Sequence, residues 1–504
     1  MQPSVYICEK ARPLLLLSLL IVYVVVLVMA GCARRTSTLN VRVMGGHHEQ
    51  SIGQRPHNDI AAVGFTGDTG CYVAYEEEEE VSLLRKLVSF GRRQPAERVL
   101  FNGQPSPWFE HIVWMGFPFE DGRLFFVARA GKKVHLYQGL RQLGSYDEVC
   151  LAFGSSKDRK TLVYAVRRGS QWYIVRNGQE TAVSGGAVTD LVLSPDGSKI
   201  AYVVQHGNQQ TIIADGKPIG RYQKATLYFL SDDGKRLVYE TRQGGKSFLV
   251  ADGKQSPPYT RIRWLSLADD GQVECYVAQL GGRQFVVWQG KRLPPYDEVG
   301  IPSLSRDGTK LAYPARVGNR WAIVVNGQEC GSYDEVASVK VSEDANLVAA
   351  AVRTGGQWFV VVNGRREGPY DSVQPALGPH GMRGPLVGLW PPVRAGSSNT
   401  RLGYAASDGS KWFVVVDGKR SAPYDHAFTP AFSRDGKHTA FVAVKRDNGL
   451  VVLDGKEGPQ YDYIAAGPVF RKDGSLEYLA VRGETLYRVT VPFNLVQGAS
   501  VNPR

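Results

Sequence analysis

The feature of this chain that most limits its fold is an internal repeat of about 37 residues. Its first marker is an Asp-Gly turn or an equivalent, found at Asp121, Asp158, Asp196, Asp233, Asp270, Asp307, Asp344, Asp435 and Asp473. A second marker, Tyr-Asp or a variant, recurs at Tyr146, Tyr222, Tyr259, Tyr296, Tyr333, Tyr370, Tyr424 and Tyr461. A repeat of this length is one supersecondary unit that buries its apolar face against neighbouring copies.

One unit, residues 224–259, shows the pattern in full. Its four expected strands cover residues 224–231, 236–241, 247–251 and 254–259. The third and fourth are joined by Asp252-Gly253, which is the signal of a two-residue β-hairpin. The 56 glycines among 504 residues agree with so many tight turns. Four antiparallel strands in one short repeat form a β-propeller blade, so the sequence predicts an all-β protein.

The repeats occupy residues 58–493, with insertions near 76–96 and 378–399. Without the insertions this region holds about eleven units, more than the usual four to eight blades. We therefore expect either two adjoining propellers or one large ring. The last unit ends near Phe493 after three clear strands, and residues 38–44 are predicted to supply the fourth.

Three segments carry a family resemblance. Residues 194–202 read Ser-Pro-Asp-Gly-Ser-Lys-Ile-Ala-Tyr, and residues 305–313 and 433–441 repeat the pattern. They resemble the WD-like repeats of TolB-type β-propellers, which implies a propeller fold and contacts with cell-envelope proteins. Residues 321–327 and 333–336 are also similar to WG-type β-repeats, which lack the Ser-x-Asp-Gly turn.

The N-terminus resembles an export signal. Lys10 and Arg12 precede residues 13–31, an uncharged stretch of 19 residues. Its end, Met29-Ala30-Gly31-Cys32, resembles the bacterial lipobox, which implies lipidation of Cys32. A transmembrane anchor and a simply cleaved signal peptide are the alternatives. All three alternatives predict a location outside the cytoplasm. Lipidation and a transmembrane anchor also predict attachment to the membrane. Residues 32–57 are then expected to be a tether and residues 494–504 a C-terminal tail.

Catalytic signatures are scarce. The sequence contains no G-x-S-x-G, H-E-x-x-H, G-x-x-x-x-G-K-[ST] or C-x-x-C motif, so we expect no enzyme, no cofactor and no metal. The alternative is a propeller hydrolase or lyase with an acidic site in its channel. Cys71, Cys150, Cys275 and Cys330 are expected to be singly buried, with one or two disulfides as the alternative.

The net charge of +12 directs attention to anionic partners. Two sets of charged residues are expected on one face of the propeller. The candidate acidic ring at the channel mouth is Asp147, Asp297, Asp334, Asp371, Asp425 and Asp462. The candidate basic rim is Lys132, Arg167, Arg242, Arg283, Arg320, Arg353 and Lys411. Local turn hydrogen bonds of the aspartates and a merely solvated set of basic loops are the alternatives.

Other repeated residues are expected to be structural. The aspartates of the Ser-x-Asp-Gly turns should cap their own backbone. Repetition also favours packing for four tryptophans, Trp172, Trp321, Trp358 and Trp412.

These observations favour a membrane-tethered, extracytoplasmic, non-catalytic scaffold that binds an envelope protein or an anionic polymer. No nucleic acid is expected as a partner. A third possibility is a surface protein whose two insertions make the contacts.

Overall fold

The structure is a computed structural model that describes residues 41–44, 47–54, 62–65, 70–77, 97–101, 104–116, 124–158, 160–268, 270–374, 388–390, 401–433, 435–471 and 473–492. The described residues contain strands and no helix, and the strands pair into eleven antiparallel sheets. We number the sheets 1 to 11 in chain order. This confirms the predicted all-β propeller class.

The first five sheets are built as follows. Sheet 1 contains β3 (Ala62–Phe65), β4 (Gly70–Glu77), β5 (Glu97–Phe101) and β6 (Gln104–Pro105); sheet 2 contains β7 (His111–Gly116), β8 (Phe125–Ala130), β9 (Lys133–Gln138) and β10 (Arg141–Tyr146). Sheet 3 contains β11 (Glu148–Ser155), β12 (Leu162–Arg168), β13 (Gln171–Arg176) and β14 (Gln179–Val183); sheet 4 contains β15 (Ala187–Leu193), β16 (Ile200–His206), β17 (Gln209–Ala214) and β18 (Lys217–Tyr222). Sheet 5 contains β19 (Lys224–Leu230), β20 (Leu237–Gln243), β21 (Lys246–Ala251) and β22 (Lys254–Gln255).

The remaining sheets follow the same plan, and in three of them the first strand is in two pieces. Sheet 6 contains β23 (Arg261–Leu267), β24 (Val273–Leu280), β25 (Arg283–Trp288) and β26 (Lys291–Arg292); sheet 7 contains β27 (Glu298–Val299), β28 (Ser303–Leu304), β29 (Leu311–Val317), β30 (Arg320–Val325) and β31 (Gln328–Tyr333). Sheet 8 contains β32 (Glu335–Val341), β33 (Val348–Thr354), β34 (Gln357–Val362) and β35 (Arg365–Tyr370); sheet 9 contains β36 (Ser372–Gln374), β37 (Gly388–Trp390), β38 (Arg401–Asp408), β39 (Lys411–Val416) and β40 (Lys419–Arg420). Sheet 10 contains β41 (His426–Ala427), β42 (Ala431–Phe432), β43 (Thr439–Lys445), β44 (Asn448–Leu453) and β45 (Lys456–Tyr461); sheet 11 contains β46 (Tyr463–Phe470), β47 (Leu476–Arg482) and β48 (Thr485–Val491) with β2 (His47–Gln54) and β1 (Val41–Met44).

The hairpins between third and fourth strands form as the sequence predicts. Asp252 and Gly253 both have positive φ, 52° and 71°, which the type I′ turn requires. Asn326 adopts the same conformation, and its side-chain oxygen accepts a hydrogen bond from the amide of Leu311 at 2.8 Å. One residue therefore shapes the hairpin and caps the second strand of its sheet.

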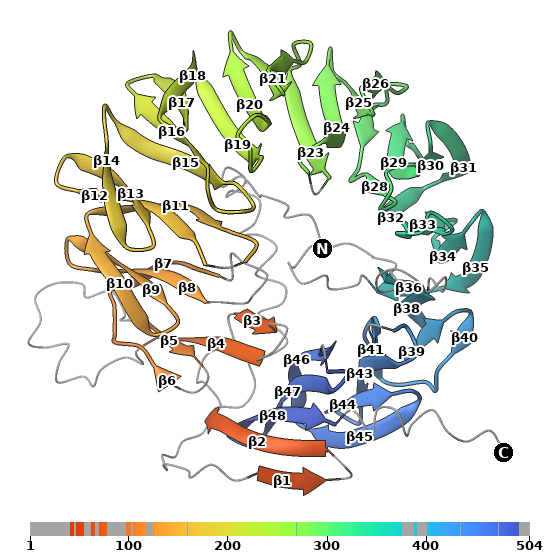
Figure 1. Cartoon of the computed structure of the whole chain (residues 1–504). Coiled ribbons are helices and arrows are strands. Elements are labelled where there is room, and N and C mark those ends of the chain that lie inside the picture. The colour runs from red at the N-terminus through yellow and green to blue at the C-terminus, as the bar shows by residue number, and fades with distance from the viewer. Residues whose placement is uncertain are drawn as a thin grey trace, which may run out of the picture.

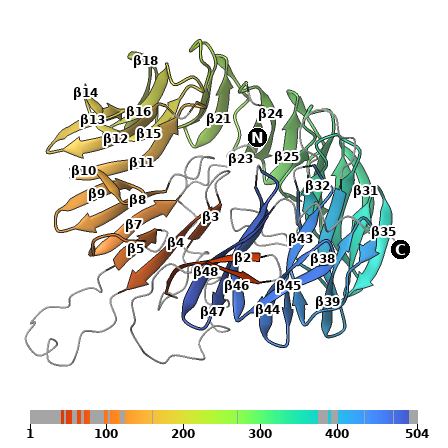
Figure 2. The same ribbon diagram turned by 60° about the horizontal axis from the view of Figure 1, so that its bottom comes forward.

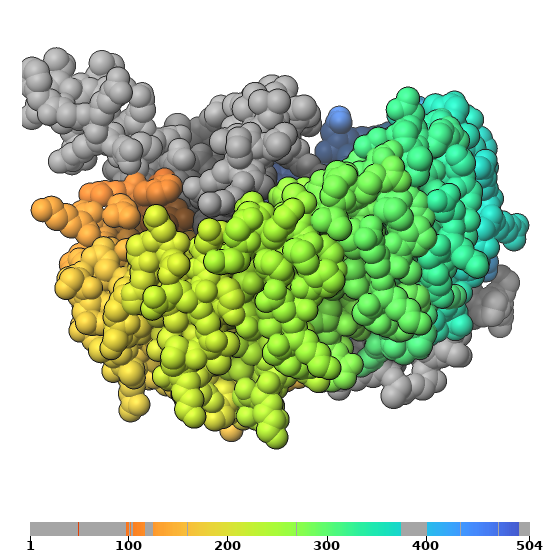
Figure 3. Space-filling model, turned by 90° about the horizontal axis from the view of Figure 1, so that it is seen from above, coloured from red at the N-terminus to blue at the C-terminus, as the bar shows by residue number. Residues whose placement is uncertain are grey.

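The sheets follow one another around a single ring, so one large ring is observed and not two adjoining propellers (Figure 1). First strands such as β15, β19 and β23 face the centre, and fourth strands such as β18 and β35 lie at the outer edge. Seen edge-on, the sheets from yellow to cyan stand side by side as a continuous wall (Figure 3). The repeat spacing is constant from Asp196 to Asp344 and leaves no linker there at which the ring could divide.

The core is divided among the junctions between sheets. Among the described residues, ten clusters of buried apolar side chains occupy the ten junctions between sheets that are consecutive in the chain. At the junction of sheets 4 and 5, for example, Val203 and Ile212 pack with Leu227. Sheets 2 to 10 each contribute to two of these clusters and so bury both faces, and burial of apolar area is the main stabilising term of folding.

The last sheet is completed by the N-terminal side of the chain. β2 pairs antiparallel with β48 (Figure 2), and β1 pairs with the outer edge of β2 (Figure 1). A strand from this region is expected, but the residues differ: β2 supplies the fourth strand, whereas residues 41–44 form a fifth. Residues 41–44 and 47–54, assigned to the tether by the sequence, are thus part of the sheet.

Several predicted features lie outside the described residues. They are the apolar segment 13–31, Cys32, the tail 494–504 and most of the two insertions. In the part of the chain that the structure describes, no helix is long and apolar enough to cross a bilayer.

Candidate functional site

The predicted acidic ring and the predicted basic rim meet in space. Asp297 shows the arrangement: one carboxylate oxygen accepts a hydrogen bond from Arg283 Nη1 at 2.7 Å, and the other accepts the amide of Gly318 at 2.7 Å. Arg283 begins the third strand of sheet 6, whereas Gly318 lies in a turn of sheet 7. The carboxylate therefore joins two consecutive sheets.

We call this arrangement a clip: a cation at the start of a third strand, the Asp that leads into the next sheet, and a turn amide of that next sheet. Four clips are present in the described residues: Lys133–Asp147–Gly169, Arg283–Asp297–Gly318, Arg320–Asp334–Gly355 and Lys411–Asp425–Arg446. The hydrogen bond from Lys133 holds the pKa of Asp147 below its usual range, and Lys411 does the same for Asp425. Asp371 and Asp462 keep only the amide contacts, from Gly409 and Gly483.

Other members of the basic rim are paired with glutamates. Arg167 Nε lies 3.1 Å from Glu148, and Arg353 Nη1 lies 3.8 Å from Glu335. Five of the seven predicted basic residues are thus ion-paired: Arg167, Arg283, Arg320, Arg353 and Lys411. Within the described part of the chain, Lys132 and Arg242 have no such partner. Whether the two sets bind a ligand stays a prediction, but most of their charge is already neutralised inside the protein.

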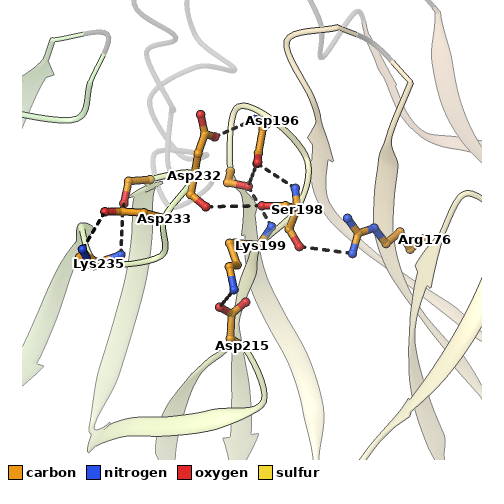
Figure 4. A network of polar contacts seen from close by, with 10 residues as sticks. Arg176, Asp196, Ser198, Lys199, Asp215, Asp232, Asp233 and Lys235 are labelled. Atoms are coloured by element: carbon orange, nitrogen blue, oxygen red, sulfur yellow. Dashed lines mark hydrogen bonds and ion pairs between the residues drawn. The ribbon is translucent and has the colours of Figure 1, made fainter.

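The Ser-x-Asp-Gly turns form structural networks on the face that carries the turns between first and second strands. Ser194 Oγ donates to Asp196 at 2.6 Å, and this bond lowers the pKa of Asp196 to about 2 (Figure 4). The amide of Asp196 donates in turn to Asp232 Oδ1 at 2.7 Å, which links the turns of sheets 4 and 5 (Figure 4). The sequence expectation that these aspartates cap the backbone is met.

The four repeated tryptophans pack in the junctions. Trp172 is buried between sheets 3 and 4, and Trp321, Trp358 and Trp412 pack against the clusters of later junctions. Packing, and not ligand stacking, explains their repetition.

Each face of the ring also carries a hollow. One of about 750 Å³ is lined by Arg129, Lys132, Asp147, Glu148 and Arg167, between sheets 2 and 3. Another of about 630 Å³ lies over the turns of sheets 3 to 6 and is lined in part by Asp158, Asp196, Asp232 and Asp270. Among the described residues, no group of three or more His, Cys, Asp and Glu is placed to hold a metal ion.

Sheet 5 breaks the pairing pattern. At its junction with sheet 6, the clip Asp is replaced by Thr260, so Lys246 has no carboxylate partner among the described residues. Lys224 and Arg242 are direct cross-strand partners, at positions that hold a Glu–Arg pair in sheets 3, 7 and 8. Arg261 starts the first strand of sheet 6 at the equivalent position. All four cations are exposed.

We call Lys224, Arg242, Lys246 and Arg261 the basic patch. Arg242 belongs to the predicted basic rim, whereas Lys224 and Arg261 do not. The signal was the loss of Asp after Tyr at residues 259–260, where the repeat keeps its length but changes its charge.

Comparison with known proteins adds the following. The chain matches no protein-family model and no curated protein. Similar solved structures include hydrazine synthase of Kuenenia stuttgartiensis, at 15% identity over 48% of this chain and 92% of that chain, with a TM-score of 0.25. The β-propeller domain of Cps50 (Swd1) of Myceliophteria thermophila matches at 14% identity over 48% and 93%, with a TM-score of 0.24. The Dos1 propeller matches at 9% identity over 68% and 93%, with a TM-score of 0.28. Values this low carry no argument about function.

Proposed function

We propose that this protein is a membrane-tethered, extracytoplasmic β-propeller scaffold that binds an anionic envelope polymer and catalyses no reaction. The basic patch is the observation that carries the proposal. Four exposed cations stand together where other sheets neutralise such charges with Asp or Glu. Among the described residues none of the four makes an ion pair, and a positive patch of this kind attracts a polyanion through its field.

The electrostatic repulsion within the basic patch, which destabilises sheet 5, supports a binding role. Like charges directly opposite on neighbouring strands destabilise a sheet, and Lys224 and Arg242 are such a pair. A polyanion bound across them would supply the charge that Glu148 supplies to Arg167 in sheet 3.

The extent of the patch favours a polymer. It runs from the first strand of sheet 5 across the sheet to the first strand of sheet 6. With strands about 4.8 Å apart, the three cations of sheet 5 extend over roughly 10 Å, and Arg261 adds a fourth charge on the next sheet. That length matches several charges of an extended chain better than one small anion.

The non-catalytic part of the proposal rests on the use of the repeated carboxylates. Those of the clips hold neighbouring sheets together, and those of the Ser-x-Asp-Gly turns hold their own turns. The tether and the extracytoplasmic location rest on the apolar segment 13–31 and Cys32.

Binding is tested with poly-L-glutamate as the polyanion. A variant with Lys224→Gln, Arg242→Gln, Lys246→Gln and Arg261→Gln is compared with the wild type by isothermal calorimetry at low and high salt. We expect the affinity to fall about tenfold or more, and wild-type binding to weaken as salt screens the charges.

The matched control removes four exposed lysines that begin fourth strands at the opposite ends of the sheets: Lys217, Lys254, Lys291 and Lys456. This control should bind as the wild type does. Equal weakening in both variants would show an effect of net charge alone and would refute the proposed patch.

The anchor is tested separately. Cells expressing the wild type or Cys32→Ala are labelled with radioactive palmitate. We expect label on the wild type only, and label retained on Cys32→Ala would exclude lipidation at this residue.

A further inference from the structure

Trp264 is exceptional in this fold. It lies in β23, the first strand of sheet 6 and hence on the inner side of the ring. Its φ is +53°, the left-handed conformation that bulky residues rarely adopt. The side chain is 37% exposed, and among the described residues it has no hydrogen-bond or ring partner. The four repeated tryptophans, by contrast, pack between sheets.

The backbone around Trp264 explains its exposure. The pairing of β23 with β24 shifts register between Arg263 and Ser266, and again between Ser266 and Leu267. Such bulges re-aim a side chain, and strained residues gather at functional sites. Here the bulge turns a large indole out of the junction instead of burying it.

The neighbours of Trp264 are charged and apolar. Arg263 precedes it and makes no ion pair among the described residues; burial, and then repulsion from Arg261, lowers its pKa, and attraction to Glu298 opposes this shift. Ile301 occupies the same repeat position in sheet 7 and is 42% exposed. Arg261 belongs to the basic patch and lies two residues from Arg263, about 7 Å along the strand. Trp264 therefore follows a cation directly in the strand that carries Arg261 of the basic patch.

We propose that Trp264 and Arg263 form a subsite for a sugar ring that carries an acidic group, so that the anionic polymer is an acidic polysaccharide. This inference rests on the proposed function. The C–H face of a pyranose is apolar and packs on the flat indole, whose N–H remains free to donate. The guanidinium of Arg263 suits a carboxylate or sulfate, because its planar fork can bind two oxygens at once.

The combination distinguishes among polyanions. Polypeptides and polyphosphates offer charge but no ring to place on Trp264, so the basic patch alone would serve them. Single-stranded nucleic acid offers both charges and rings, and it is the competing ligand in the test.

The test compares three probes of similar length: alginate, which is a polyuronate, poly-L-glutamate and oligothymidylate. The variant Trp264→Gly removes the indole and keeps the fold, since Gly adopts positive φ without strain. We expect the wild type to bind alginate about tenfold more tightly than poly-L-glutamate. Trp264→Gly should lose that preference and bind poly-L-glutamate as before. Trp264→Phe, which keeps an aromatic face, should retain part of the preference, and Arg263→Gln should weaken alginate binding.

The matched control is Trp108→Ala, because Trp108 is 43% exposed but lies in the chain between β6 and β7, which are well separated from β23 in the ring (Figure 1). It should leave all three affinities unchanged. Unaltered alginate binding by Trp264→Gly would overturn the subsite, as would oligothymidylate binding tighter than alginate with the same dependence on Trp264. If the patch variant binds poly-L-glutamate like the wild type, the proposed function itself fails; if only the alginate preference is missing, the function stands and this inference alone fails.

Discussion

Glu49 and Arg482 lie 433 residues apart in the chain, and the two terminal nitrogens of Arg482 donate to the Glu49 carboxylate at 3.1 Å each. The hydroxyl of Tyr461 donates to the same carboxylate at 2.6 Å, and the Glu49 side chain is fully buried. β2 is thus held in the last sheet by a charged contact as well as by its pairing with β48.

Replacing Glu49 should loosen the N-terminal strand. In Glu49→Gln the negative charge opposite Arg482 is lost, and one of the two acceptor oxygens becomes an NH2 donor, so we expect a loss of about 2 kcal/mol in the free energy of unfolding. Thermal unfolding and limited proteolysis near residues 41–54 would measure it. Glu484→Gln, at an exposed turn residue, is the control and should behave as the wild type. Equal stability of Glu49→Gln and the wild type would show that strand pairing alone holds β2.

Thr260→Asp should build the missing clip. The backbone is ready: the amide of Thr260 bonds to Gln279 as that of Asp297 bonds to Arg316, and Gly281 shares the φ of +58° found at Gly318. The new carboxylate would pair with Lys246, and we expect a gain of about 1 kcal/mol in the free energy of unfolding.

The same substitution should weaken binding of poly-L-glutamate, because it neutralises part of the basic patch. Thr260→Asn, which can accept from Gly281 but carries no charge, is the control and should keep the binding. Unchanged binding by Thr260→Asp in calorimetry would argue that Lys246 takes no part in the site.

Asp190 should give the protein a distinct pH dependence. Burial raises its pKa to about 6, although its carboxylate accepts the amides of Leu191 and Leu227 at 2.9 Å each. The folded state therefore holds this proton more tightly than the unfolded state, whose Asp pKa is about 3.9. The contribution to stability is fully present below about pH 4 and is lost as the pH rises through 6.

The expected size of this effect is at most about 3 kcal/mol. Urea unfolding from pH 4 to pH 7 would measure it, and Asp190→Asn should flatten this part of the curve. The exposed Asp447→Asn should leave the curve as it is. A wild-type curve of the same slope as Asp190→Asn would contradict the assignment.

The cysteines should differ in reactivity. Cys330 is exposed, whereas Cys150 and Cys275 are buried, and burial raises the pKa of each of these two thiols to about 12. Because the thiolate is the reactive form, iodoacetamide should modify Cys330 in the native protein and spare the other two. Peptide mass spectrometry reads each site, with urea-unfolded protein as the control in which all three react. Native modification of Cys275 would indicate opening of its sheet junction.

The expectation that Cys330 is buried was wrong, since β31 is a fourth strand at the edge of its sheet.

The repeat determined the local structure. A turn such as Asp252-Gly253 needs only its own residues to adopt positive φ, and an apolar strand such as β20 needs only neighbours on both faces. The strands, the hairpins and the number of units near eleven could therefore be predicted from spacing and residue type. The structural role of Asp196 followed in the same way, because its partner Ser194 lies two residues away.

Tertiary structure decided everything that joins residues from different sheets. Asp297 and Gly318 belong to consecutive repeats, and only the junction of sheets 6 and 7 brings the carboxylate to 2.7 Å from the amide. Trp264 shows nothing unusual in sequence, because its exposure depends on the register shifts of β23 against β24. The contact of Glu49 with Arg482 depends on how the ring ends, and no local pattern records a contact across 433 residues. Short-range hydrogen bonds and periodicity depend on residues close together in the chain, so the sequence predicts them. Charge pairing across junctions depends on the curvature of the complete ring.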